Sequence, residues 1–473
     1  MYKLIFILSL LIITLQSYGQ VFISGEIKNV PKGSAVDVTY DNNAIDWVEL
    51  SAGKTETDEN GKFTLTIKLA KSQKANLSIG DQYTEMFLVP GDSLHVVCDY
   101  SDFDSTLYYT GKGAADNNYL AAESLQDYDK KANRYSFFSD AEQYKRYEDS
   151  LETANNEFLK SHDSPLFSNA FRNYITTTTK YRYINPRWMF KITYDKATKK
   201  ITMRDLPEEY FSFLKTIDLN EQQSSENTEY SVAVDRYINE VNDAKVRKTI
   251  LDTITEIQKN KMLITQNYNF RKSILKGRVL DYQLTTFLKN TIGRFNSDRK
   301  FMDELIEDYK TVCKNPEYIA IIDENYARAN KLSAGKPSPD FALLNMDGNI
   351  VSLSSLKGKV VFIDYWATWC VPCIVAMPVT HKLIEKFKDN KDVVFLNVNV
   401  NDDFTKWKNF VTKEKMSGEN LYANKEQSDN LYKSYNIIGI PHYVLIDKQG
   451  KMIETNADNT VKTENKITIA LNQ

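Results

Sequence analysis

Two cysteines separated by two residues stand where a short apolar run gives way to a helical pattern. The run is Val360-Val361-Phe362-Ile363, and the pair is Cys370-Val371-Pro372-Cys373. A continuous apolar run of this length is typical of a strand buried on both faces, whereas residues 371–387 have the spacing of a helix. The sequence therefore predicts a buried strand, a short turn and a helix whose first turn carries two thiols. Such a pair can form and break a disulfide.

Strands and helices alternate throughout the last third of the chain. The expected strands are residues 341–344, 350–353, 360–365, 393–400, 443–447 and 451–455, and the expected helices are residues 371–387, 403–415, 428–435 and the segment from Thr463 onward. A strand–helix–strand unit followed by a hairpin and a closing helix is typical of an α/β fold with a mixed central sheet flanked by helices. We assign this domain to residues 335–473.

The first two thirds of the chain have other patterns. Since 473 residues exceed one core of ordinary size, we expect a multidomain chain with two or three domains. Residues 20–112 alternate apolar and polar positions between turn signals, which predicts a small antiparallel β-sandwich. In residues 113–334 the apolar period lengthens to that of a helix, as at Tyr144 and Leu151, and we predict a helical domain without assigned chemistry.

The N-terminus has the pattern of an export signal. Lys3 precedes an apolar run over residues 4–15, and small residues stand shortly before Gln20. We predict a signal peptide over residues 1–19. The apolar run is shorter than the ~20 residues that a membrane-spanning helix needs. We therefore expect cleavage, no stable membrane insertion afterwards, and a mature chain in the periplasm or another extracytoplasmic space.

Charge and cysteine content limit the kinds of partner and cofactor that the chain is expected to bind. The chain has 60 Lys+Arg against 63 Asp+Glu without a basic arm, which argues against nucleic acid as a partner. Outside the pair there are only Cys98 and Cys313, each within an apolar pattern, and we interpret both as small buried core residues. A c-type haem would need a His in place of Ile374, and a zinc site would need more ligands than His381 adds. We expect no cofactor and no metal.

The C-terminal region, residues 336–473, resembles the thioredoxin superfamily and, within it, the exported TlpA/ResA-type thiol-disulfide oxidoreductases. The resemblance rests on Gly-Lys-Pro-Ser-Pro-Asp-Phe at 335–341, the segment 366–373 around the cysteines, Pro378, and Ile438-Gly439-Ile440-Pro441 before an apolar strand. Residues 58–63 and 89–94 resemble the sandwich domain of unassigned function that precedes thioredoxin-like domains in many exported Bacteroidetes proteins.

The helix start should activate one thiol of the pair. Unpaired backbone N–H groups and the positive end of the helix dipole stabilise a thiolate, so the pKa of Cys370 should fall below the ~8.5 of a free thiol. Cys370 would attack a substrate disulfide, and Cys373, one turn on and more buried, would attack Cys370 and release the product. Cys370 and Cys373 then form a redox-active disulfide. Trp369 would shield the pair and offer substrates an apolar surface.

Asp364 stands where thioredoxins carry an Asp that handles the proton of the resolving cysteine. A buried carboxyl has a raised pKa and can act as a general acid or base near neutral pH. Many TlpA/ResA-type proteins have a Glu where this chain has Ala376, and the strand over residues 393–400 lacks the Lys of thioredoxins. The resemblance therefore implies that proton transfer falls on Asp364. The alternative is a structural Asp that serves as a hydrogen-bonding residue.

The resemblance also implies a cis bond between Ile440 and Pro441. This bond would face the cysteine pair and leave nearby backbone groups free to pair with an extended substrate peptide. Only ~5% of X-Pro bonds in folded proteins are cis, so the residues alone would not predict one. His442 follows, and it would tune Cys370 or contact the substrate; the alternative is a partly exposed His at the edge of a strand.

We therefore predict an enzyme, an extracytoplasmic thiol-disulfide oxidoreductase that exchanges disulfides with protein substrates. We expect a reductase or isomerase rather than an oxidase. A reductase in that compartment needs an outside source of electrons, and a membrane thiol donor would supply them. The alternative is an envelope binding or assembly protein whose N-terminal domains bind a partner and whose thiol pair senses redox state.

Overall fold

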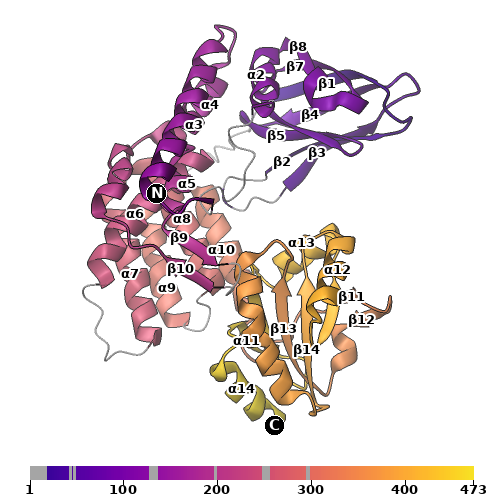
Figure 1. Cartoon of the computed structure of the whole chain (residues 1–473), viewed down its shortest axis with the longest axis vertical. Coiled ribbons are helices and arrows are strands. Elements are labelled where there is room, and N and C mark those ends of the chain that lie inside the picture. Colours follow the sequence, from indigo (N-terminus) through magenta and orange to yellow (C-terminus); the bar gives the residue numbers. More distant parts are fainter. Residues whose placement is uncertain are drawn as a thin grey trace, which may run out of the picture. The chain divides into compact units, whose positions relative to one another are not determined.

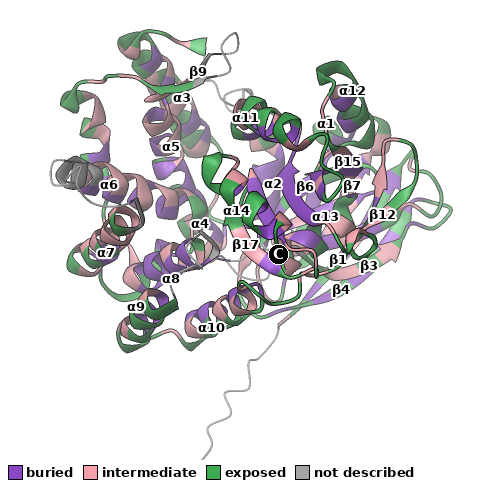
Figure 2. Cartoon of the chain, turned by 90° about the horizontal axis from the view of Figure 1, so that it is seen from below, coloured by how far each residue is buried: buried purple, intermediate pink, exposed green. Residues whose placement is uncertain are grey.

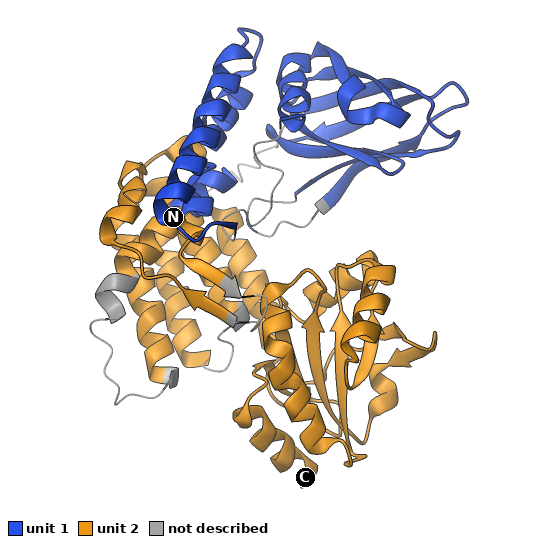
Figure 3. Cartoon of the chain, in the orientation of Figure 1, with its two compact units in different colours: residues 1–187, 226–233 blue, residues 188–225, 234–473 orange. Residues whose placement is uncertain are grey.

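The structure is a computed structural model that describes residues 19–41, 45, 49–126, 137–195, 200–247, 256–294 and 299–473. The predicted signal peptide lies outside the described residues apart from Gly19. Figure 3 shows two compact units, residues 1–187 with 226–233 and residues 188–225 with 234–473. The domain boundaries expected after residues 112 and 334 differ from this division and stay predictions. Within the described part of the chain, no helix is both long and apolar enough to cross a membrane.

Two four-stranded sheets form the N-terminal part of the first unit (Figure 1). One has the order β4-β1-β7-β8, built from β1 (Gly19–Lys28), β4 (Lys62–Leu69), β7 (Ser93–Asp99) and β8 (Tyr108–Lys112). The other has the order β3-β2-β5-β6, built from β2 (Ala35–Asp41), β3 (Glu49–Glu56), β5 (Gln73–Ile79) and β6 (Gln82–Leu88). Alternate side chains of both sheets share one apolar core, and the predicted sandwich is confirmed. The pair β1–β7 is parallel, unlike the others.

Helices stand before and after β8 in the chain, and an aromatic cluster joins three of those that follow β8 to β6. They are the 3-10 helix η1 (Tyr100–Asp102), α1 (Phe103–Thr106), α2 (Ala114–Ser124), α3 (Ala141–Ser161), α4 (Asn169–Tyr181) and α5 (Ile184–Met189). Asp140 and Ser168 cap α3 and α4 by accepting backbone N–H groups of the first turn. Phe87 of β6 packs with Tyr119, Phe158 and other apolar residues of these helices. The aromatic residues here are core.

The second unit begins with further helices. They are η3 (Glu208–Thr216), η4 (Gln222–Ser224), α6 (Thr228–Arg247), α7 (Glu256–Ile274), α8 (Gly277–Arg294), α9 (Arg299–Val312) and α10 (Pro316–Lys331). The residues of α6 up to Ala233 belong to the first unit. The region also holds an antiparallel pair of short strands, β9 (Ile192–Asp195) and β10 (Lys200–Met203), which the helical prediction missed. Cys313 follows α9 and Cys98 lies in β7; both are buried and free, as predicted.

The C-terminal part is built on a seven-stranded mixed sheet of order β12-β11-β15-β14-β13-β16-β17 (Figure 1). Its strands are β11 (Ala342–Asn345), β12 (Ile350–Ser352), β13 (Val360–Trp366), β14 (Val393–Asn399), β15 (Glu419–Tyr422), β16 (His442–Ile446) and β17 (Met452–Ala457). The strands β13, β14 and β15 run parallel, and every residue of β13 is buried. The predicted α/β fold is confirmed, and β15 is an additional strand.

Helices cover both faces of this sheet. They are η5 (Leu353–Leu356), α11 (Val371–Phe387), α12 (Phe404–Glu414), α13 (Lys425–Ser434) and α14 (Val461–Leu471). Phe362 of β13 packs with side chains of α11 and α14, whereas its neighbour Ile363 packs with side chains of α13. Figure 2 shows that the outer sides of α11 and α14 are exposed while the strands beneath are buried. Successive residues of a strand point to opposite faces, so Asp364 points to the side of α11 and Tyr365 to the side of α13.

Candidate active site

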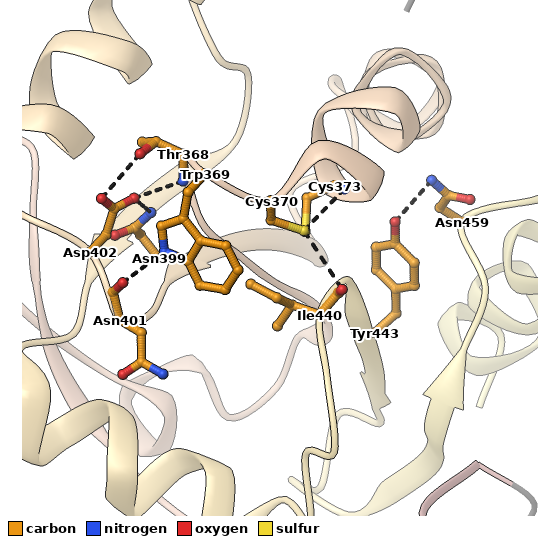
Figure 4. The surroundings of a disulfide bond; sticks show 10 residues. All are labelled: Thr368, Trp369, Cys370, Cys373, Asn399, Asn401, Asp402, Ile440, Tyr443 and Asn459. Atoms are coloured by element: carbon orange, nitrogen blue, oxygen red, sulfur yellow. Dashed lines mark hydrogen bonds between the residues drawn. A yellow bond between two sulfur atoms is a disulfide. The ribbon is translucent and has the colours of Figure 1, made fainter. Parts of the chain in front are cut away.

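The cysteine pair forms a disulfide at the start of α11 (Figure 4). The Cα atoms of Cys370 and Cys373 are 5.3 Å apart, and the Cys373 N–H points at Cys370 Sγ over 3.2 Å. Pro372 occupies the first turn, where its missing N–H costs no helix bond. Each cysteine is 3% exposed, so the prediction that Cys373 is the more buried is wrong. Packing of Trp407 and Ile440 around the pair covers Cys370 as well.

A carboxylate beyond the end of β14 holds the turn before the pair. Asp402 accepts hydrogen bonds from the Thr368 N–H at 2.7 Å and from the Thr368 hydroxyl at 3.0 Å (Figure 4). Asn399 Nδ2 donates to the same carboxylate at 3.2 Å. Sequence reasoning missed Asp402. The available signal was its place just after a buried parallel strand, because functional side chains gather at that edge of a sheet.

Trp369 lies beside the disulfide with its ring open to solvent. Its indole N–H donates to the Asn401 carbonyl at 2.8 Å, which fixes one edge of the ring. The residue is 58% exposed. The ring therefore presents an apolar surface next to Cys370, and its part in substrate binding stays a prediction.

Ile440, which precedes Pro441, lies next to the disulfide in Figure 4. The bond between the two residues is cis, as the resemblance implies. The Ile440 carbonyl oxygen lies 3.6 Å from Cys370 Sγ. Ile440 and Pro441 are both partly exposed. A backbone segment thus borders the reactive sulfur, and its pairing with a substrate peptide stays a prediction.

His442 is buried, so the partly exposed position considered from the sequence is wrong. It is 4% exposed because β17 pairs with β16 on the outside and makes β16 an internal strand. Its ring lies 6.0 Å from that of Tyr365, on the side of the sheet that α13 covers. Burial lowers the pKa of His442 to about 4, and its Nε2 has no hydrogen-bond partner within the described residues. A role in tuning Cys370 stays a prediction.

Asp364 lies on the opposite side of the sheet, beneath α11. It is 6% exposed, and burial raises its pKa to about 7, while a hydrogen bond from the Thr380 hydroxyl opposes that rise. Its partner across β14 is Asn397, which donates its amide to the Ser417 carbonyl at 2.7 Å. No cation faces Asp364 from that strand. The carboxyl is therefore neutral or charged according to small changes near neutral pH.

Three polar residues near Asp364 were not found from the sequence. Thr380 comes from α11, Tyr443 from β16 and Asn459 from the connection between β17 and α14. Asn459 Nδ2 lies 3.0 Å from Thr380 Oγ1 and 3.3 Å from the Tyr443 hydroxyl oxygen (Figure 4 draws Tyr443 and Asn459). Hydroxyl and amide side chains at these positions carry no motif, so only the topology reveals that they meet.

A set of side chains that could bind a metal ion is absent from the part of the chain that the structure describes. No group of three or more His, Cys, Asp or Glu side chains there could hold an ion. The reactive groups that the site contains are the thiol pair and the buried carboxyl beneath it.

Comparison with known proteins points to the same chemistry. Residues 333–471 match the family model described as Redoxin. The thiol-disulfide oxidoreductase ResA of Bacillus cereus is 31% identical over 129 residues, which cover 27% of this chain and 72% of the relative. The ResA of Bacillus subtilis is 30% identical over 129 residues, 27% of this chain and 70% of the relative.

A solved structure also matches. The thioredoxin domain of a thiol-disulfide oxidoreductase from Bacteroides vulgatus is 30% identical, covers 28% of this chain and 97% of its own, and has a TM-score of 0.27. Each of these matches spans less than a third of the chain. The resemblance of residues 20–112 to a sandwich domain of exported proteins therefore stays a prediction.

Proposed function

The chain belongs to the ResA-type thiol-disulfide oxidoreductases, and we propose that it works outside the cytoplasm as a reductase or isomerase of protein disulfides. The observation that carries the proposal is the cysteine pair at the start of α11, with the Ile440 carbonyl oxygen 3.6 Å from Cys370 Sγ. The exposed Trp369 ring beside it offers an apolar surface that suits a protein substrate.

The helix start supports Cys370 as the nucleophile of the reduced protein. The Cys373 N–H already points at Cys370 Sγ, and the positive end of the α11 dipole favours a thiolate there. In the first step this thiolate attacks one sulfur of a substrate disulfide. A bond forms between the two sulfurs, and the other substrate sulfur leaves as a thiolate that takes up a proton.

Cys373 then completes the exchange. Its thiol gives up a proton, and the resulting thiolate attacks Cys370 Sγ, which releases the second substrate sulfur as a thiolate. Two electrons have passed to the substrate, and the protein holds the disulfide seen in the structure. We propose that Asp364 accepts the proton of Cys373, and that a membrane thiol donor returns two electrons to the pair for the next turnover.

Replacement of the nucleophile tests the enzyme. A Cys370→Ser protein should lose essentially all insulin reduction, since the attacking thiolate is gone. The matched control is Cys98→Ala, which removes a free buried cysteine of the sandwich and should keep the wild-type rate. Insulin reduction by Cys370→Ser at the wild-type rate would contradict the proposal.

The direction of electron flow is a separate measurement. A reduction potential of the Cys370–Cys373 pair near or below about −250 mV would support a reductant, whereas a value near about −120 mV would make the protein an oxidant. For the location, residues 1–19 fused to a reporter enzyme that is active only after export should give reporter activity. A fusion retained in the cytoplasm would overturn the extracytoplasmic assignment.

The alternative of a binding or assembly protein is tested by trapping. Cys373→Ala cannot resolve the mixed disulfide, so an oxidoreductase should accumulate covalent complexes with several clients. The absence of such complexes, together with tight binding of one partner by the wild-type chain with its thiols blocked, would favour the binding protein.

A further inference from the structure

We propose that Asn459 and Thr380 form a hydrogen-bonded chain that directs one O–H group onto Asp364, and that Thr380 is thereby a positioning residue for proton transfer from Cys373. The inference rests on the proposed function and deepens the part that it gives to Asp364. It concerns residues of α11 and of the connection before α14, which the cysteine motif does not include.

Thr380 lies on the same face of α11 as the resolving cysteine. Cys373 and Thr380 are both buried, and their spacing of seven residues corresponds to two helical turns. Asp364 points toward this face from β13 and receives a hydrogen bond from the Thr380 hydroxyl. The helix that carries the thiols therefore also carries the donor to the carboxyl.

Asn459 determines which way the Thr380 hydroxyl points. Its Nδ2 can only donate, and it lies 3.0 Å from Thr380 Oγ1, so Thr380 accepts there. A Thr inside a helix usually donates to the carbonyl four residues before it, which here belongs to Ala376. Asn459 Nδ2 also donates to that Ala376 carbonyl, at 3.2 Å. With its usual acceptor engaged and its oxygen occupied, the hydroxyl hydrogen has two remaining partners, Asp364 and the Tyr443 phenol. An ionised carboxylate is the stronger acceptor of the two, so the hydrogen goes to Asp364 when that residue is charged.

The other groups around Asp364 do not supply a comparable donor. From β14 the facing residue is Asn397, which is uncharged and donates elsewhere. From β16 the facing residue is Tyr443. Burial raises the pKa of its phenol, and the negative charges of Asp364 and Asp458 raise that pKa further. Asp364 Oδ1 has no hydrogen-bond partner within the described residues. The Thr380 hydroxyl is thus the group that favours the ionised carboxyl.

This arrangement poises Asp364 for exchange with a thiol. Burial alone would keep the carboxyl protonated, and the Thr380 hydrogen bond brings its pKa back to about 7. In the forward step the proton leaves Cys373 for Asp364 as the Cys373–Cys370 bond forms, and Asp364 then releases it to the departing substrate thiolate. Without the Thr380 donor, most Asp364 carboxyls would be protonated at neutral pH, and a smaller fraction of molecules could accept that proton.

The test follows one turnover of the reduced full chain with oxidised glutathione. Acid quenching and mass spectrometry separate formation of the Cys370–glutathione mixed disulfide from its resolution by Cys373. Thr380→Val should raise the pH midpoint of resolution by about one unit and slow resolution about fivefold at pH 7, because a hydrogen bond to a charged group is lost. Formation of the mixed disulfide should keep its rate.

Three further variants make the result specific. Thr380→Ser keeps the hydroxyl and should restore the wild-type profile, and Asn459→Ala should raise the midpoint in the same direction by a smaller amount. Thr412→Val removes a hydroxyl that donates to its own helix on α12, and it should leave the profile in place. A folded Thr380→Val protein with the wild-type midpoint, or a Thr380→Ser protein with the valine profile, would overturn the inference.

The outcomes also separate this inference from the function on which it rests. If the wild-type chain forms no mixed disulfide with glutathione and does not reduce insulin, the proposed function fails. If the wild-type chain reacts and Asp364→Asn abolishes the pH midpoint while Thr380→Val and Asn459→Ala leave it unchanged, the function stands and the hydrogen-bonded chain is rejected.

Discussion

Asp364 and His442 are two buried titratable residues on opposite faces of one sheet. They sit on paired strands, β13 and β16, and burial favours the neutral form of each. Their surroundings differ, because Asp364 receives the Thr380 hydroxyl whereas His442 Nε2 has no hydrogen-bond partner among the described residues. The pKa of Asp364 is about 7, and that of His442 is about 4.

The comparison shows that burial sets the direction of a pKa change but does not by itself let a group exchange protons at neutral pH. A group exchanges protons at neutral pH only when its pKa is close to that pH. A donor to the charged form brings Asp364 there, and His442, lacking a counterpart, stays neutral. The sheet therefore has one reactive face, under the thiols, and one face whose histidine is silent near pH 7.

The largest expected effect comes from removing the carboxyl. Asp364→Asn should slow resolution of the mixed disulfide about a hundredfold at pH 7, the usual size of a general acid–base contribution. It should also stabilise the fold. The folded-state pKa of about 7 lies above the ordinary value of 3.8, so ionising Asp364 costs stability as pH rises from 3.8 to 7, by about 4 kcal/mol in total.

The free energy of unfolding measured at pH 4 and pH 9 checks this expectation. Asp364→Asn should gain little at pH 4 and most at pH 9. The control is Asp347→Asn, in an exposed turn, which should change neither value appreciably. An equal gain at both pH values would mean that Asp364 does not titrate as argued, and the contrast with His442 would collapse.

His442 should change stability with pH by a smaller amount and in the opposite direction: its contribution falls as pH falls. Its folded pKa of about 4 lies below the ordinary 6.5, so the unfolded chain binds the proton first as pH falls. Stability should therefore drop from pH 6.5 to pH 4, by about 3 kcal/mol. His442→Phe should remove this part of the acid sensitivity in denaturant titrations, whereas His162→Gln, at an exposed position, should retain it. Undiminished acid sensitivity in His442→Phe would show that another group causes it.

The smallest expected effect comes from adding a positive charge beside Asp364. Asn397→Lys would place a cation on the same side of the sheet, at the paired position of β14. A nearby opposite charge should lower the pKa of Asp364 by about one unit or more, and the pH midpoint of resolution should fall with it. Asn397→Gln, without a charge, serves as the control. A midpoint that rises in the Lys variant would show that lost packing outweighs the charge.

The sequence predicted the elements that carry strong periodicity. Residues 371–387 were expected as a helix and form α11, and the apolar run from Val360 forms a strand buried along its whole length. The short strand β15 was missed because Glu419–Tyr422 has two polar residues among four. Its pairing with β11 and β14 depends on the fold of the whole domain, as does the pair β9–β10 inside a helical region.

The candidate site shows the same limit. A motif marks Cys370 and Cys373 because their chemistry requires that spacing, and Asp364 stands at a fixed distance before them. Exposure of His442 was misjudged because strand order, which no local pattern reveals, places β17 outside β16. Thr380 and Asn459 meet only when the connection before α14 reaches α11, so residues far apart in sequence become partners.

The position of Asn459 near the end of the chain has a consequence during synthesis, which starts at the N-terminus. The thiols of α11 leave the ribosome before Ile440, Tyr443 and Asn459 do. A nascent chain therefore carries both cysteines before the carboxyl beneath them has its oriented donor. On the inferred arrangement, proton transfer to Asp364 reaches its full rate only when the connection before α14 has reached α11. Disulfide exchange at full rate is then a property of the finished domain and not of the growing one.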